Sequence, residues 1–425
     1  MKRILAVFLV LCMVSSFGVL VFADDNDDDK LTLDIIIPRY SDNTEDWFLR
    51  GRTGMNETNF TEMFEEKNPE IKLNIEVVDW SNIYSVVDSR IASGQVPDVL
   101  CSDIFVDYVN KDLLEPASQW CPGELFNDDL FPAYIDNSVI DDVCWAIPDL
   151  ATIRVLCYNA DIFDEAGVYP PTTWGEIEEV CQAIYDFYDG EVCPLGIDMT
   201  ADEGQAAFSY FIWNNAGDYL DADDNWILNC AENVEAVGYA VGLVNKGYTN
   251  PNPESQARDE LKDMFAAGKI AMLIESNQMP AFLEEAESDV NLGVAPIPAN
   301  EGKDSITFAI MHRMMAFKDE KCENQDARDA AIRSFVSSFY AIEDYNDWVS
   351  MEGLLPVRDM AAKALAASDP DLQVWISYLD ASKLYPLRKV EWDEVKKGIV
   401  DAEQSVLAGA SVQDTLDALQ AKFAD

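Results

Sequence analysis

The stretch from residue 60 to residue 103 alternates between helical and strand-like hydrophobic patterns, and this alternation constrains the fold most. Apolar residues recur at helical spacing before Pro69, which ends that helix because proline cannot donate a backbone hydrogen bond. Residues 71–77 then alternate apolar and polar side chains with the period of a half-buried strand. A second helical pattern ends at Gly94, and residues 97–101 read as a short apolar strand. This rhythm predicts an α/β layer with largely parallel strand pairing.

Length and charge narrow the class of protein. A chain of 425 residues exceeds what one hydrophobic core usually serves, so two domains are expected. The sequence holds 79 acidic and 29 basic side chains, for a formal net charge of -50. This charge repels DNA, RNA and anionic lipid, so we expect no nucleic-acid partner. We interpret the acidity as a solubilising surface of a secreted or salt-adapted protein, with recognition of a cationic ligand as the alternative.

The first 23 residues have the pattern of a cleaved export signal. Lys2 and Arg3 precede a mostly apolar run, and Ala23 offers a small residue at the cleavage position. An acidic run follows directly, which favours cleavage over an uncleaved membrane anchor. Cys12 lies too early for lipid attachment and lacks the surrounding small residues. The mature chain is therefore expected to be soluble and periplasmic or extracellular.

The sequence gives little support for a metal or cofactor site. No C-x-x-C motif occurs, and the only histidine is His312, so zinc is not expected. Residues 221–232 place acidic and amide side chains at the spacing of a calcium loop, but Trp226 stands where that loop needs glycine. We therefore expect no calcium site there, and no cofactor.

Eight cysteines remain after the signal segment, and in an oxidising compartment this even number permits disulfides. Cys181 and Cys193 bracket a short segment and are a candidate pair. Cys101 and Cys157 lie in apolar, strand-like runs, where a buried free thiol is expected.

Several short motifs occur in a fixed order along the chain. Thr173 and Glu176 form a capping box, in which each side chain satisfies a backbone donor at a helix start. The motifs are FEEKNPEIKL from Phe64, IASGQVPDV from Ile91, LLEP from Leu113, PPTTWGE from Pro170, FAAGKIAM from Phe265 and GLLPVR from Gly353. In this order the chain resembles bacterial extracellular solute-binding proteins of family 1, the sugar-binding subunits of ABC importers that include the maltodextrin-binding proteins.

The resemblance implies an α/β, two-lobe periplasmic-binding-protein fold of type II. It also implies a polar hairpin tip before a helix at residues 221–232, in place of a calcium loop. Three crossings would join the lobes, near residues 151–155, 291–298 and 318–321. The implied N-terminal lobe is discontinuous, with residues 24–153 and 292–320, and the C-terminal lobe comprises residues 154–291 and 321–425.

The resemblance also implies a ligand site between the lobes. Aromatic side chains would cover the faces of sugar rings: Tyr40, Trp80, Trp213 and Trp392. Polar side chains would fix the hydroxyl groups: Asp103, Thr152, Glu275, Gln278 and Arg358. His312 would lie close to the cleft. Residues 275–278 depart from the glycine and tryptophan that relatives often carry there, and polar contacts from Glu275 or Gln278 would replace the missing aromatic.

Each of these residues has a structural alternative. A tryptophan is more often part of a core than of a site, a lone histidine is more often a hydrogen-bonded structural residue, and Asp103 could cap its helix.

The predicted function is capture of a sugar or oligosaccharide by hinge closure, and its delivery to ABC permease subunits by a monomer. No catalytic constellation is present: the sequence has no G-x-S-x-G and no glycine-rich phosphate loop. With so many carboxylates, a glycosidase pair cannot be recognised from sequence. A secreted carbohydrate-active enzyme, a binder of a cationic solute, and a protein that presents its ligand to a sensor receptor are the alternatives.

Overall fold

A computed structural model describes residues 30–41, 43–51, 58–201, 203–368 and 370–423. The predicted export signal, residues 1–23, lies outside these residues. Among the helices that are described, none is long and apolar enough to cross a membrane.

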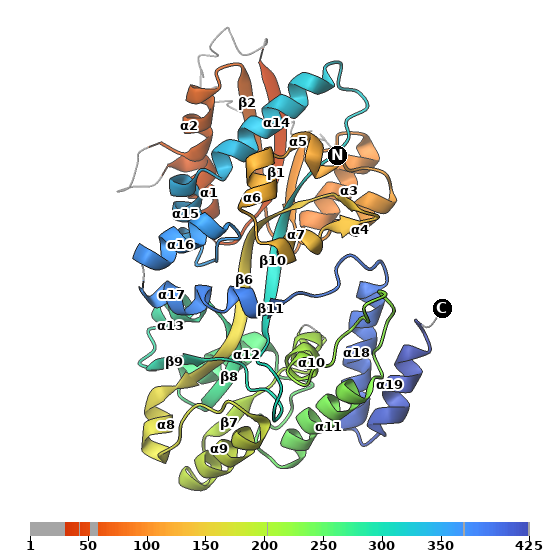
Figure 1. Cartoon of the computed structure of the whole chain (residues 1–425). Coiled ribbons are helices and arrows are strands. Elements are labelled where there is room, and N and C mark those ends of the chain that lie inside the picture. The colour runs from red at the N-terminus through yellow and green to blue at the C-terminus, as the bar shows by residue number, and fades with distance from the viewer. Residues whose placement is uncertain (1–29, 42, 52–57, 202, 369, 424–425) are drawn as a thin grey trace, which may run out of the picture.

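One mixed sheet runs through the whole molecule, with strand order β2-β1-β3-β10-β6-β8-β7 (Figure 1). The strands on this path are β1 (Leu31–Pro38), β2 (Ile71–Val78), β3 (Val99–Ser102), β6 (Ile147–Asn159), β7 (Cys193–Gly196), β8 (Ile270–Ser276) and β10 (Thr307–Ala316). Strand β9 (Leu292–Ala295) pairs with β6, and β11 (Ser382–Lys383) pairs with β10. The outer pairs β1–β2, β1–β3 and β7–β8 are parallel as predicted, whereas β6 and β10 pair antiparallel with each other.

Strands β6 and β10 join two halves of the molecule (Figure 1). They have 13 and 10 residues, which at about 3.3 Å per residue makes them roughly 43 and 33 Å long. Each strand therefore belongs to the sheet of both halves.

The first half is built on β1, β2 and β3 (Figure 1). Its other elements are α1 (Asn43–Glu45), a π-helical turn (Asp46–Arg50), α2 (Phe60–Lys67), α3 (Ile83–Ser93), α4 (Val106–Asn110), α5 (Ala117–Trp120), α6 (Gly123–Asp128), α7 (Pro132–Asp136), β4 (Val139–Ile140), β5 (Val143–Cys144), α14 (Gln325–Phe339), α15 (Ile342–Met351), α16 (Asp359–Ser368) and α17 (Pro370–Ile376). Asn59 caps α2 by accepting a hydrogen bond from the backbone of Glu62. Gly94 ends α3 in a left-handed conformation, as the sequence predicts.

The second half is built on β7, β8 and β9 (Figure 1). Its helices are α8 (Ala160–Ala166), α9 (Trp174–Phe187), α10 (Gly204–Trp213), α11 (Ala231–Asn245), α12 (Arg258–Ala266), α13 (Met279–Glu285), α18 (Trp392–Leu407) and α19 (Val412–Gln420). The capping box of Thr173 and Glu176 starts α9, which confirms that prediction.

The connections differ in part from those predicted. The first predicted crossing, residues 151–155, lies within β6. The second passage is β10 and not residues 291–298, because β9 pairs with the far end of β6 inside the second half. The third passage contains β11 and leads from α17 to α18 (Figure 1), whereas Lys318 bonds to Leu113 of the first half.

Helices α14 to α16 also differ from the predicted grouping of residues 321–425. Helix α14 packs against β1 and α5, and α15 packs against α14. Phe335 of α14 and Trp348 of α15 lie in a large apolar cluster that extends from these elements to α12 and β8. A second cluster joins α9, α10 and α11 with Val395 of α18 and Leu416 of α19. The C-terminal residues are therefore divided between the two halves, because the apolar faces of α14 and α15 cover the sheet of the first half.

The predicted polar hairpin tip near Trp226 is present. Asp221 accepts hydrogen bonds from the backbone of Asp223 and Asn225, and Leu220 forms a bridge with Trp226. No cluster that could hold a metal occurs among the described residues. The eight described cysteines are free thiols, so the candidate pair Cys181–Cys193 is not bonded here.

Candidate functional site

The candidate site is built along one face of β6 and β10. Phe308 lies opposite Arg154, and directly opposed side chains project from the same face of a sheet. Ile310 lies opposite Thr152 in the same way. Ile310 and His312 are half-buried, whereas every other residue of β10 is buried. The two strands therefore provide a floor that runs from the first half to the second.

An aromatic group of Tyr40, Trp80 and His312 lies at the first-half end of this floor. Tyr40 follows β1 and Trp80 follows β2, and parallel strands bring their carboxyl ends together. The Tyr40 ring stacks on His312 at 5.2 Å between centroids, and the Trp80 ring lies 4.8 Å from His312. The Tyr40 hydroxyl also lies 3.1 Å from Nδ1 of His312. All three residues are half-buried, so part of each residue remains accessible.

Electrostatics keep the aromatic group uncharged near neutral pH. Burial lowers the pKa of His312 to about 4; Asp103 raises it and Arg313 lowers it further, but burial dominates. Burial, followed by the carboxylate of Asp149, raises the pKa of Tyr40 well above its usual value. The group therefore presents a neutral imidazole and a neutral phenol.

Asp103 lies at the carboxyl end of β3, near the aromatic group. Its carboxylate accepts a hydrogen bond from the hydroxyl of Tyr84, and its backbone carbonyl accepts one from Arg313 Nη1 at 2.9 Å. Helix α4 begins after Phe105 without a side-chain cap, so the alternative that Asp103 caps this helix is wrong. Thr152, 8% exposed, lies between the two ends of the floor.

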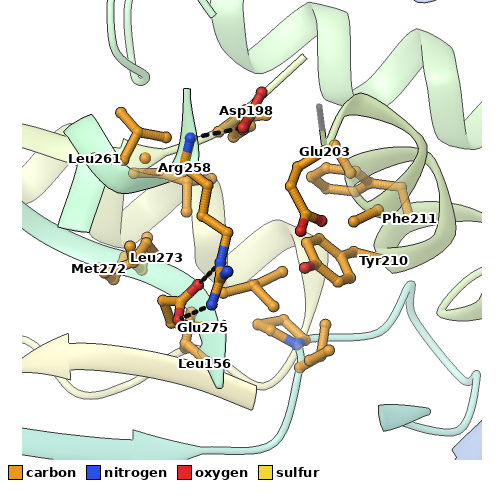
Figure 2. A pocket seen from close by; sticks show the side chains of 18 of the residues that line it. Leu156, Asp198, Glu203, Tyr210, Phe211, Arg258, Leu261, Met272, Leu273 and Glu275 are labelled. Carbon is orange, nitrogen blue, oxygen red and sulfur yellow. Dashed lines mark hydrogen bonds and ion pairs between the residues drawn. The ribbon is translucent and has the colours of Figure 1, made fainter. Parts of the chain in front are cut away.

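Four charged residues, Arg154, Glu203, Arg258 and Glu275, form a network at the second-half end of the floor; Figure 2 shows the last three. Glu275 accepts from Arg154 Nη1 at 2.8 Å and from Arg258 Nη2 at 2.8 Å. Arg154 Nη2 also lies 3.4 Å from Glu203. Burial alone would raise the pKa of Glu275, but the two guanidinium groups outweigh it and lower the pKa to about 2. Glu275, predicted to contact ligand, therefore holds β6, β8 and α12 together in this structure.

A pocket opens beside this network, under helix α10. Asp198, Glu203, Arg258 and Glu275 line it together with the hydroxyl-bearing ring of Tyr210 (Figure 2). The rest of its lining is apolar. The Tyr210 ring lies 5.9 Å from that of Phe308, which places the pocket beside the floor.

Trp213 and Trp392 belong to the core of the second half. Trp213 is 2% exposed and donates from Nε1 to Asp218 at 3.0 Å, while Trp392 is 6% exposed and stacks near Tyr385 at 4.7 Å. Neither ring is open to the floor as a stacking surface. The aromatic positions were predicted from sequence alone, which does not show which side of a helix faces the core.

Arg358 and Gln278 also lie apart from the floor. Arg358 pairs with Asp129 and donates to the backbone carbonyl of Tyr340, inside the first half. Gln278 is half-buried at the start of α13 and lies beside Gly353, so it borders the first half.

Sequence reasoning missed Arg154, Glu203, Tyr210 and Arg258. Glu203, Ala207 and Tyr210 are spaced to lie on one face of α10, and this spacing next to an aromatic run is the signal that could have found them. Arg154 and Arg258 carry no such signal, because their role depends on Glu275 in a strand far along the chain.

Two α/β halves that share two long strands, with aromatic and polar side chains along the shared face, define a two-lobe binding protein. The chain belongs to the bacterial extracellular solute-binding protein family, whose model matches residues 52–322. This family membership confirms the prediction of a solute-binding protein rather than an enzyme.

Known relatives support this assignment over most of the chain. A binding protein of Brucella abortus (strain 2308) is 25% identical over 358 residues, covering 83% of this chain and 85% of the relative. The mannitol-binding protein of Pseudomonas aeruginosa is 24% identical over 234 residues, or 53% of this chain and 52% of the relative. The crystal structure of a cyclic alpha-maltosyl-1,6-maltose binding protein from Arthrobacter globiformis matches with a TM-score of 0.78 at 21% identity, covering 92% and 97% of the two chains. The predicted two-lobe α/β fold is confirmed.

Proposed function

We propose that the chain captures a sugar, polyol or oligosaccharide between its two halves and delivers it to the permease of an ABC transporter. The observation that carries this proposal is the aromatic group of Tyr40, Trp80 and His312 beside a floor that ends in polar side chains. Partly exposed rings can cover the apolar face of a sugar, while polar groups bond its hydroxyls. Relatives named for mannitol and for a cyclic maltosyl-maltose support the same class of solute.

In this proposal the ligand contacts come from both ends of the floor. Tyr40, Trp80, His312 and Asp103 would act from the first half, and Thr152 from the floor itself. On the second half, Glu203 and Tyr210 replace the predicted Trp213, Trp392 and Arg358, whose side chains are already engaged elsewhere. Gln278 would contact ligand only at the border between the halves.

The two halves would act as lobes that close by bending where strands pass between them. Guided by the packing, we assign residues 30–150 and 313–381 to one lobe and 155–307 and 386–423 to the other. The bending points would be residues 151–154 in β6, 308–312 in β10 and 382–385. The chain would act as a monomer outside the cytoplasm, after removal of the export signal.

Binding of a panel of sugars, polyols and polyamines tests the proposal. A ligand that binds only the native state raises the melting temperature, and calorimetry then gives its dissociation constant. Trp80→Ala should weaken binding of the best sugar or polyol by about 10-fold or more, because it removes the open ring of the aromatic group. Tyr169→Ala is the matched control, since that ring is 85% exposed and lies in the connection between α8 and α9.

Two results would contradict the proposal. The first is a melting temperature that no sugar or polyol raises while a polyamine does. The second is a Trp80→Ala variant that binds as tightly as the Tyr169→Ala control.

A further inference from the structure

We infer that the pocket under α10 is a subsite for one small apolar group carried by the ligand, such as the methyl group of a 6-deoxyhexose or of a methyl glycoside. This inference rests on the proposed function and specifies the solute further. We call the apolar part of the pocket the pouch; it is lined by Leu156, Ile177, Phe211, Leu261 and Met272.

The pouch has an apolar interior and a charged mouth. Leu156, Phe211, Leu261 and Met272 are each at most 5% exposed and come from β6, α10, α12 and β8. At the mouth, the carboxylate of Glu203 and the guanidinium of Arg258 face a common space with the hydroxyl of Tyr210 (Figure 2). A ligand that fits must therefore be polar where it meets the mouth and apolar where it enters the pouch.

The mouth retains hydrogen-bonding capacity. Glu203 makes one long contact, 3.4 Å from Arg154, and its side chain is 23% exposed. Tyr210 is half-buried, and its ring lies against Phe308 on the floor. Hydroxyl groups of a sugar that lies on the floor would therefore come within reach of the mouth.

Size limits what the pouch can hold. The whole pocket, mouth included, has a water-accessible volume of about 50 Å³, so the pouch is well below the roughly 150 Å³ of a cavity that admits benzene. A sugar ring does not fit into this space, but a methyl or ethyl group does. Water is a poor occupant, because a buried water needs two to four polar partners and the interior offers aliphatic and aromatic surface.

An unfilled space like the pouch is also unusual in a protein core. Protein interiors leave few voids larger than one water, and a lasting void removes packing contacts from its walls. Ala206 and Ala207 on α10 line this one, where larger side chains would fill it. A void next to a polar mouth and beside the floor is better explained by a group that enters with the ligand.

Matched sugar pairs test this inference. Each pair consists of a 6-deoxyhexose and its 6-hydroxy parent, or of a methyl glycoside and its free sugar, and binding is measured by calorimetry. For at least one pair, the wild type should bind the member with the apolar group about fourfold more tightly. This is the gain for the one carbon that a methyl glycoside adds, and a 6-deoxyhexose gains because no hydroxyl has to be buried without a partner. In Ala207→Val, which adds two carbons to the wall, that ratio should fall to about one.

Two further variants serve as a control and as a second test of the pouch. Ala240→Val is the matched control, because Ala240 is 3% exposed in the same core on α11 but does not line the pouch; it should keep the wild-type ratio. Leu261→Ala enlarges the pouch, so its preference should move from methyl to ethyl or propyl glycosides.

The outcomes separate this inference from the proposed function. If sugars bind but no pair is discriminated, or if Ala207→Val and Ala240→Val change the ratio equally, the subsite is refuted while the proposed function stands. If no sugar or polyol binds at all, the proposed function fails and this inference fails with it.

Discussion

Removing the carboxylate of Glu275 should destabilise the protein strongly. Glu275 is 1% exposed and accepts hydrogen bonds from Arg154 Nη1 at 2.8 Å, Arg258 Nη2 at 2.8 Å and the Ser276 backbone at 2.9 Å. In Glu275→Gln, the charge of Arg154, itself 3% exposed, loses its principal partner.

The pKa of Glu275 sets the magnitude of this effect. A pKa lowered from 4.5 to about 2 corresponds to about 3 kcal/mol at roughly 1.4 kcal/mol for each pKa unit. Breaking a buried ion pair by removing one partner typically costs about 3–5 kcal/mol. We therefore expect Glu275→Gln to lower the free energy of unfolding by about 3 kcal/mol.

The assay is equilibrium urea unfolding of Glu275→Gln, of the single variants Glu275→Leu and Arg154→Met, and of the double variant of the last two. Because the double variant removes both charges, it should be more stable than the sum of the single losses predicts, by about 2 kcal/mol. Asp359→Asn is the control: its ion pair with Lys363 joins side chains that are 44% and 74% exposed, so the loss should be small.

The pH dependence gives a second readout with a definite sign. The folded pKa of Glu275 is below the unfolded value, so its contribution is complete above pH 4.5 and is lost as the pH falls toward 2. Over that range the wild type should lose stability faster than Glu275→Gln. The reasoning is refuted if Glu275→Gln costs less than about 1 kcal/mol at pH 7, or if the losses of the single variants add without coupling.

Three further predictions concern buried groups. Burial lowers the pKa of His312 to about 4. The contribution of the neutral imidazole to stability is therefore complete above its usual pKa of 6.5 and is lost as the pH falls through 4. In thermal melts over this range, the melting temperature of His312→Gln should depend less on pH than that of the wild type. Burial raises the pKa of Asp149 to about 7 despite a hydrogen bond from Cys101, so its contribution is complete below pH 3.8 and is lost as the pH rises through 7. The change in the free energy of unfolding caused by Asp149→Asn, measured by urea unfolding, should therefore be about 2 kcal/mol more favourable at pH 8 than at pH 5. Equal changes at both pH values would contradict this. Trp213→Phe removes the hydrogen-bond donor to Asp218 and leaves a void, so it should lower the free energy of unfolding by about 1–3 kcal/mol. The dissociation constant for the sugar should not change. A large loss of affinity without loss of stability would instead place Trp213 in the site.

Local features of the fold could be predicted because a few neighbouring residues encode them. Gly94 ends α3 in the left-handed conformation that favours glycine, and Thr173 with Glu176 starts α9 by bonding two backbone donors. Strands β2 and β3 followed from alternation and from a short apolar run, whereas β1 was not predicted. The second and third passages between the halves could not be predicted in the same way, because β10 looks like an ordinary strand in sequence and β11 has only 2 residues.

The candidate site was predicted in part. Tyr40, Trp80 and His312 were named from sequence and come together in the structure. Trp213 and Trp392 were named by the same reasoning, but both rings fill the second core. A tryptophan in a helix has the same sequence signature in either role, and only the packing of the helix decides which face it turns inward.

The sequence by itself determined the α/β class, the helix boundaries set by caps, the acidic character and, through its motifs, the family. The tertiary structure alone decided which charges meet, since Arg154, Glu203, Arg258 and Glu275 come from four segments that are separate in the sequence. It also decided where the two halves are joined, and it left a pouch under α10. The physical reason is the range of the interactions: caps and periodicity act within a few residues, whereas ion pairs, strand order and cavities depend on segments that meet only when the chain has folded.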